Sequence, residues 1–215
     1  MNFDYGEIAW GTSGDRYSNR VQRRDYPIRA AIYLQNKLEV DEFTVNAGLR
    51  LDYSNANTKW YDIAYTNADF YSSSYDETKS YPEKETKAQW QLSPRLGISH
   101  PITEHSKLYF NYGHFKQMPD YESMLRLQRT GTKSISTIGD PNITLAKTVA
   151  YELGFDYLID DQYLINIAGF YRDITDQKGY IDFISNTKGY NFTYAASNNY
   201  EDVKGMEFTI RKNTE

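Results

Sequence analysis

The 215-residue sequence contains no cysteine, which excludes disulfide frameworks, thiolate zinc sites and cysteine nucleophiles. No run of 18 apolar residues is present, so we expect no membrane-spanning helix. The formal net charge is 24 − 29 = −5 and no basic block occurs. We therefore expect no nucleic-acid partner, because such binding needs many phosphate-neutralising side chains. Residues 1–5 lack a basic segment and an apolar core, so we expect no signal peptide in this chain.

Aromatic residues, in contrast, are abundant. The sequence has 21 tyrosines, 10 phenylalanines and 3 tryptophans. Disordered chains are poor in such residues, whereas β-strands are enriched in them. The composition therefore favours a folded, β-rich protein.

The clearest periodicity lies in residues 43–53, where Phe43, Leu49 and Tyr53 belong to an apolar set that alternates with polar residues. A period of two over eleven residues predicts a strand with one apolar and one polar face. Six further segments show the same pattern, which gives about seven strands: 32–40, 90–99, 108–113, 149–157, 163–171 and 200–212.

The connections between these strands are of two kinds. Short turns are expected near 40–42, 100–105 and 159–162, and long polar loops near 54–87, 118–147 and 175–199. Each kind falls on its own side of the strands. Short turns on one side and long extracellular loops on the other are typical of an outer-membrane barrel.

Alternation alone leaves two folds open, because a soluble β-sandwich turns its apolar face inward and a membrane barrel turns it outward. The predicted strand length favours the barrel, since ten residues at about 3.3 Å, tilted by about 40°, rise roughly 25 Å. Aromatic residues at strand ends and glycines and charges on the polar face point the same way. We therefore predict an antiparallel up-and-down transmembrane β-barrel. A soluble β-sandwich that binds a carbohydrate or another ligand is the alternative.

No catalytic or metal-binding pattern stands out. His100, His105 and His114 lack metal-ligand spacing, and no carboxylate pair or Ser–His–Asp set can be nominated. We therefore expect no enzyme, no metal site and no cofactor.

Two loop features are candidates for function or for packing. Trp60, Tyr61, Tyr65 and Tyr71 crowd the loop 54–87, where they could stack on sugar rings or flat ligands or pack the loop on itself. Residues 121–128 predict a short helix with Asp120 as its N-cap. Within the third strand, Pro94 predicts a bulge or a late strand start.

Four groups of segments resemble the barrel of TonB-dependent outer-membrane receptors. The first is AAIYLQNKL at 30–38 with VNAGLRLD at 45–52, and the second is LSPRLGIS at 92–99 with KLYFNYG at 107–113. The third is DPNITL at 140–145 with TVAYELG at 148–154, and the last is VKGME at 203–207. They occur in the order that the family has them, and the resemblance covers about residues 28–213.

The resemblance implies an internal piece of a 22-stranded barrel, about seven strands over residues 1–215, without the plug domain that fills such barrels. It implies import of a siderophore, vitamin or glycan with energy from TonB, in the outer membrane of a Gram-negative bacterium. The implied partners are outer-membrane lipid, the plug and remaining barrel strands, TonB through that plug, and a small-molecule or oligosaccharide substrate. Four charged residues of the polar face would point to the lumen and the plug: Arg50, Arg95, Glu152 and Glu207.

Overall fold

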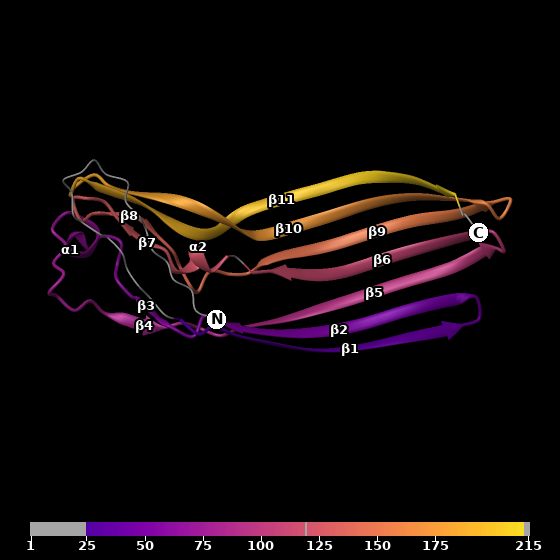
Figure 1. Ribbon diagram of the computed structural model, residues 1–215, viewed down its shortest axis with the longest axis horizontal. Coiled ribbons are helices and arrows are strands. Elements are labelled where there is room, and N and C mark those ends of the chain that lie inside the picture. The colour runs from indigo at the N-terminus through magenta and orange to yellow at the C-terminus, as the bar shows by residue number, and fades with distance from the viewer. Residues whose placement is uncertain (1–24, 119, 213–215) are drawn as a thin grey trace.

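The computed structural model describes residues 25–118 and 120–212, and it is an all-β structure built on one curled nine-stranded sheet (Figure 1). Seven long strands lie side by side in chain order, and each is antiparallel to its neighbours. They are β1 (Ile28–Val40), β2 (Phe43–Asn55), β5 (Gln89–Thr103), β6 (Ser106–Gln117), β9 (Ala146–Ile159), β10 (Tyr163–Ser185) and β11 (Tyr190–Lys212). The seven expected strands are therefore present, each longer than its apolar pattern.

The short turns gather at one end of the sheet and the long connections at the other (Figure 1). Asp41, Asp160 and Asp161 adopt positive φ in these turns, a conformation that aspartate tolerates better than most residues. The turn expected at 100–105 is shorter than predicted. Strand β5 continues to Thr103, and a register shift between Pro101 and Thr103 accommodates the proline.

Neither the bulge nor the late strand start predicted at Pro94 is present. Strand β5 begins at Gln89, and Pro94 pairs with Leu49 in an unbroken β2–β5 register. On its other side the β5–β6 ladder begins only at Arg95, so the missing N–H of the proline interrupts no run of paired residues there.

The long connections hold small elements of their own. Strands β3 (Lys59–Tyr61) and β4 (Glu83–Glu85) form a two-stranded sheet, and helix α1 (Ala68–Tyr71) lies in the connection between them. Helix α2 (Tyr121–Leu125) is followed by β7 (Leu127–Arg129) and β8 (Ile135–Ile138). Strand β8 pairs in parallel with Thr193 and Tyr194 at the edge of β11, and β7 pairs with β8.

The cap predicted for the second helix is confirmed, since the Asp120 carboxylate accepts a hydrogen bond from the Ser123 amide at 2.7 Å. The helix is shorter than the predicted 121–128 because Leu127 already belongs to β7.

The segment 175–199 is not the long loop that its polarity suggested. Strands β10 and β11 continue through it as a paired ladder and turn only at residues 186–189. A register shift between Ile174 and Gln177 marks the point where the extension begins. Beyond that point the apolar and polar residues no longer alternate strictly, so the strand signal disappears from the sequence.

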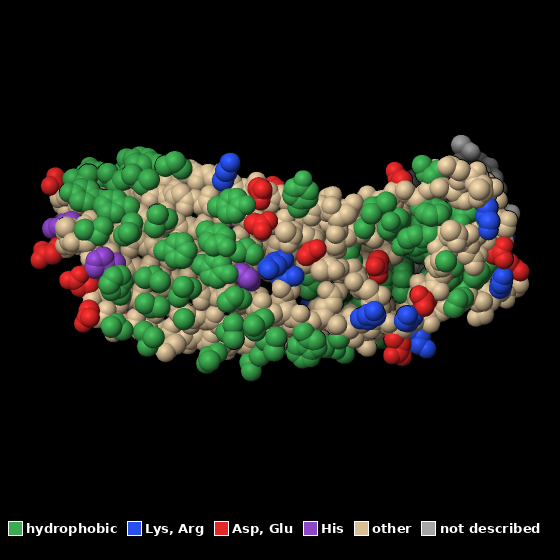
Figure 2. Space-filling view, turned by 180° about the vertical axis from the view of Figure 1, so that it is seen from behind, with side chains coloured by type: hydrophobic (Ala, Val, Ile, Leu, Met, Phe, Trp, Pro, Cys, Tyr) green, Lys and Arg blue, Asp and Glu red, His purple; other side chains and the backbone are tan. Residues whose placement is uncertain are grey.

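The two faces of the sheet differ in polarity. Apolar side chains gather over the strands on one face (Figure 2), where Leu34, Leu49 and Met206 are 77%, 46% and 80% exposed. No second sheet covers this face in the described residues. The sandwich alternative is therefore wrong, because a sandwich buries its apolar face against a second layer. No helix in the described ranges is long and apolar enough to cross a membrane.

The hydrophobic core lies among the long connections instead. Phe70, Tyr71, Met124 and Ile135 are all at most 1% exposed and belong to one cluster. Phe192, on the extension of β11, belongs to the same cluster. The loops and the β10–β11 extension thus form one packed unit, which we call the loop cap.

Candidate functional site

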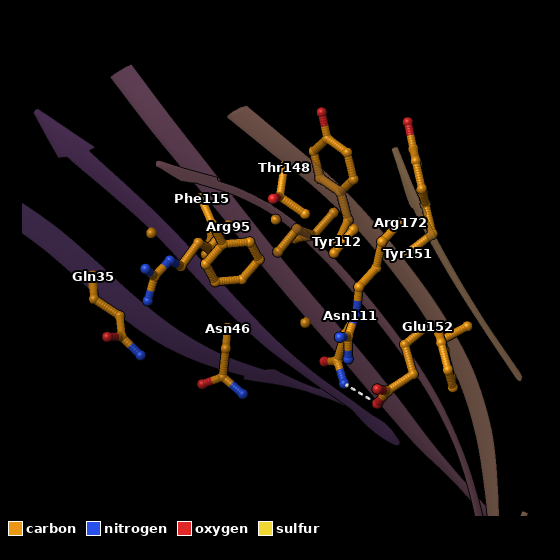
Figure 3. Close-up of a pocket in the computed structure, with 17 residues that line it drawn as sticks. Gln35, Asn46, Arg95, Asn111, Tyr112, Phe115, Thr148, Tyr151, Glu152 and Arg172 are labelled. Atoms are coloured by element: carbon orange, nitrogen blue, oxygen red, sulfur yellow. Dashed lines mark hydrogen bonds between the residues drawn. The ribbon is translucent and has the colours of Figure 1, made fainter. Parts of the chain in front are cut away.

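The first candidate site is the concave face of the sheet, which encloses a hollow of about 710 Å³ (Figure 3). Its lining comes from six strands, and the polar side chains of Gln35, Asn46, Arg95, Asn111 and Glu152 face it. Because side chains alternate along a strand, the apolar positions between them point to the opposite face.

The charged residues expected on this face are held by local contacts. Arg50 donates to both oxygens of the Asp52 carboxylate at 2.8–3.0 Å. The Arg95 guanidinium lies 4.8 Å from the centre of the Phe115 ring. Glu152 accepts a hydrogen bond from the Asn111 amide at 3.1 Å (Figure 3).

The contacts of Arg95 and Glu152 join neighbouring strands, whereas that of Arg50 lies within β2, and the sequence pattern alone could not specify them. Glu207 occupies the same face on β11, opposite Ala168, and is exposed there. Whether the four charged residues contact a plug stays a prediction.

One glycine on this face makes room for a ring. The Tyr109 side chain lies over Gly154 on the neighbouring strand, where an added Cβ would come 2.1 Å from the ring. The Tyr109 hydroxyl accepts a hydrogen bond from Asn166, which also donates to Asp156. Tyrosine, glycine and the two polar partners therefore lock three strands together.

The second candidate site is a smaller hollow of about 340 Å³ in the loop cap. All four aromatic candidates line it: Trp60, Tyr61, Tyr65 and Tyr71. The structure thus brings together residues that the sequence had placed only in one loop.

Two of the four are packing residues rather than free stacking surfaces. Tyr71 is 1% exposed, with its ring stacked 4.3 Å from that of Phe192. Trp60 is 6% exposed, and its indole N–H donates to the Gly139 carbonyl at 3.0 Å. Their ring faces are covered, which favours the packing alternative for Trp60 and Tyr71; ligand binding by any of the four stays a prediction. Trp60 and Tyr71 form the wall of the hollow.

Tyr61 and Tyr65 remain accessible at its rim. Tyr65 is 37% exposed, and its ring contacts that of Tyr194 at 4.6 Å. Burial and then the nearby charge of Asp140 raise the pKa of Tyr65 to about 12, so its hydroxyl is neutral at physiological pH. A neutral phenol beside an aromatic face can both stack on a ring and exchange hydrogen bonds.

Sequence reasoning missed the polar residues of this hollow, which are Asp62, Lys84, Asp140 and Asn142. Lys84 and Asp62 form an exposed ion pair of 3.5 Å. Burial raises the pKa of Asp140, whose carboxylate accepts from the Asn142 amide at 2.8 Å. The Asp140–Pro141–Asn142 turn was visible in the sequence, but its position against the loop 54–87 depends on long-range packing.

The three histidines lie apart. His100 stacks on Phe43, His105 lies 3.5 Å from Asp161, and His114 hydrogen-bonds Tyr112. Within residues 25–118 and 120–212, no group of three His, Asp or Glu side chains is arranged to hold a metal ion.

The sequence profile of the family described as "TonB dependent receptor-like, beta-barrel" matches residues 2–213. No curated protein matches the sequence.

Several solved structures share the fold at low identity. The hemophore receptor HasR of Serratia marcescens, solved with its hemophore HasA and heme, has a TM-score of 0.65 and 16% identity, over 94% of this chain and 34% of that one. The ferric enterobactin receptor PfeA of Pseudomonas aeruginosa has a TM-score of 0.58 and 17% identity, over 97% and 27%. The copper transporter OprC has a TM-score of 0.56 and 18% identity, over 88% and 26%. The chain thus spans between a quarter and about a third of the length of these structures.

Proposed function

Because the chain belongs to the TonB-dependent receptor β-barrel family, we propose that it forms part of a receptor that binds and imports a scarce ligand. The ligand would be a siderophore, vitamin or glycan, and TonB would supply the energy. The observation that carries this proposal is the loop cap. It places an aromatic and charged hollow beyond one end of a sheet whose concave face is polar.

The family consists of transport receptors of the Gram-negative outer membrane, not of enzymes. The solved structures named above are a hemophore receptor in complex with its hemophore and heme, a ferric enterobactin receptor and a copper transporter. These relatives make metal chelates the first cargo to test. Vitamins and oligosaccharides follow, since rings of tyrosine stack on any flat or sugar-like surface.

In this proposal the long connections lie outside the cell and the concave face forms part of the barrel lumen. Arg50, Arg95, Glu152 and Glu207 would then offer charge-assisted hydrogen bonds to a plug domain. Arg95 and Glu152 already line one hollow, which supports a shared docking surface for these two. Outer-membrane lipid would cover the apolar face.

The test uses a strain that lacks the full-length receptor and regains it on a plasmid. We expect uptake of at least one labelled ferric siderophore, cobalamin or oligosaccharide to return with the wild-type gene and to require TonB. Replacing Tyr65 by alanine should weaken uptake of that ligand about three- to tenfold, the value of one aromatic contact.

Tyr180→Ala is the matched control, because Tyr180 is an exposed tyrosine on the β10 extension that does not line the loop hollow. Equal losses for the two variants would show that the hollow does not select the ligand. If uptake of the ligand persisted in a strain without TonB, the proposed energy source would be rejected.

A further inference from the structure

The hollow of the loop cap has one more carboxylate than it has basic side chains. Its charged lining residues are Asp62, Lys84 and Asp140. Lys84 lies 3.5 Å from Asp62 and balances the charge of that carboxylate. In residues 25–118 and 120–212, no ion pair joins Asp140 to a basic side chain. The hollow therefore keeps one uncompensated negative charge, which a ligand of opposite charge would complement.

The Asp140 carboxylate is held in place by the turn that follows it. Its Oδ1 atom accepts a hydrogen bond from the Asn142 backbone amide at 2.8 Å. The Asn142 side-chain oxygen accepts in turn from the Lys87 backbone amide at 2.7 Å, and Pro141 between the two residues is fully buried. Asp140 itself is only partly buried and lines the hollow. A carboxylate fixed in this way loses little conformational entropy when it binds a partner.

Tyrosine rings share the hollow with this carboxylate. Tyr61 and Tyr65 both line it, and Tyr65 is 37% exposed. The charge of Asp140 reaches the Tyr65 hydroxyl, because it adds to burial in raising the pKa of that group. The face of an aromatic ring attracts a cation, as a carboxylate does. The uncompensated charge and the accessible ring therefore favour the same class of ligand.

We propose that the hollow of the loop cap binds a positively charged group of its ligand, an ammonium or alkylated ammonium, between the Asp140 carboxylate and the Tyr65 ring. The inference rests on the proposed function, because it assigns a charge to the cargo that the same hollow receives. The volume of about 340 Å³ suits such a group on a short chain, so a larger cargo would enter by its cationic end. A metal chelate with a free amino group has this chemistry.

The experiment is an NMR titration of the purified full-length receptor in a non-ionic detergent with two probes. One is choline, and the other is its neutral isostere dimethylbutanol, in which carbon replaces the nitrogen. Wild type should bind choline about tenfold more tightly, the combined value of one ion pair and one cation–π contact at partly exposed groups. Asp140→Asn should weaken choline binding about fivefold and leave binding of the alcohol unchanged. Asparagine keeps the turn, because its side-chain oxygen accepts the same hydrogen bond.

Two further variants separate charge from structure. Asp182→Asn is the matched control, because Asp182 is an exposed carboxylate of the loop cap that bonds to Thr193 and does not line this hollow. It should bind both probes like wild type. Asp140→Glu keeps the negative charge and should retain the preference for choline, which distinguishes the loss of charge from a change in the shape of the hollow.

Equal affinity of wild type for choline and dimethylbutanol would overturn the proposal. Equal binding of choline by wild type and Asp140→Asn would overturn it as well, because the charge of Asp140 would then play no part. Displacement of choline by the same concentration of sodium chloride is a third refuting result, since the hollow would then attract any cation. The assay involves neither uptake nor TonB, so its failure would leave the transport proposal standing, and a failure of uptake would leave the measured charge preference unchanged.

Discussion

A positive charge at Leu49 should prevent the sheet from assembling in a bilayer. Leu49 lies on the apolar face, between Leu34 and Pro94 of the adjacent strands, and is 46% exposed. It is six residues from Phe43 and four from Tyr53, the aromatic residues near the two ends of β2. With about 3.3 Å per residue and a tilt of about 40°, these separations correspond to roughly 15 and 10 Å.

Leu49 therefore lies close to the middle of an apolar band about 25 Å tall. An arginine on the lipid face at this depth costs about 2–4 kcal/mol. We expect Leu49→Arg to lower the free energy of unfolding of the full-length receptor by that amount. The assay is denaturant unfolding of the receptor reconstituted in lipid vesicles, followed by the shift in gel mobility between folded and unfolded barrel.

Gln35→Arg is the matched control. Gln35 pairs with Gly48, next to Leu49, so it has nearly the same depth, but it lines the concave hollow. We expect a change within about 0.5 kcal/mol for this variant. Equal losses at positions 35 and 49, or a loss below about 0.5 kcal/mol for Leu49→Arg, would refute the assignment of the two faces.

Three further predictions concern single contacts. Gly154→Ala should destabilise the barrel by about 1–3 kcal/mol because its Cβ collides with the Tyr109 ring. Denaturation should show a smaller loss when Gly154→Ala is made in a Tyr109→Ala background, where the ring is gone. Trp60→Phe should cost about 1–3 kcal/mol in the loop cap by leaving the Gly139 carbonyl without its indole donor, seen as faster proteolysis of the loop 54–87 with unchanged barrel stability. For Asp120, burial opposes ionisation, but hydrogen bonds from Ser123 and Lys178 prevail and lower the pKa to about 2. The stabilisation of α2 by ionised Asp120 is thus fully present above the unfolded pKa of 3.8 and is lost as the pH falls through about 2. Hydrogen exchange of the helix amides should follow this loss. Asp120→Asn should remove the pH dependence.

The sequence predicts the strands well where one face is apolar and the other polar. Residues 43–53 show this, because lipid and lumen impose opposite demands on alternate side chains. The helix cap at Asp120 is equally local, since it depends on residues three positions apart. Both features could therefore be predicted without knowledge of the fold.

The extension of β10 and β11 over residues 175–199 could not be predicted from the sequence, because backbone pairing there needs no alternation of polarity. The loop hollow was predicted only in part. Its aromatic residues were visible in one segment, but the burial of Tyr71 depends on Phe192, more than a hundred positions away. The same holds for β8, whose parallel pairing with β11 joins distant segments that no local pattern connects.

The placement of the hydrophobic core in the loop cap has a consequence for how ligand choice can change over evolution. A truncation at Phe70 or Tyr71 opens a cavity and costs about 3–5 kcal/mol, so these positions tolerate little variation. Tyr65 and Lys84 at the rim of the same hollow are exposed, so their replacement opens no such cavity. Selection can therefore exchange the rim residues one at a time while the wall behind them keeps its shape. A new cargo would then be acquired without rebuilding the fold that presents it.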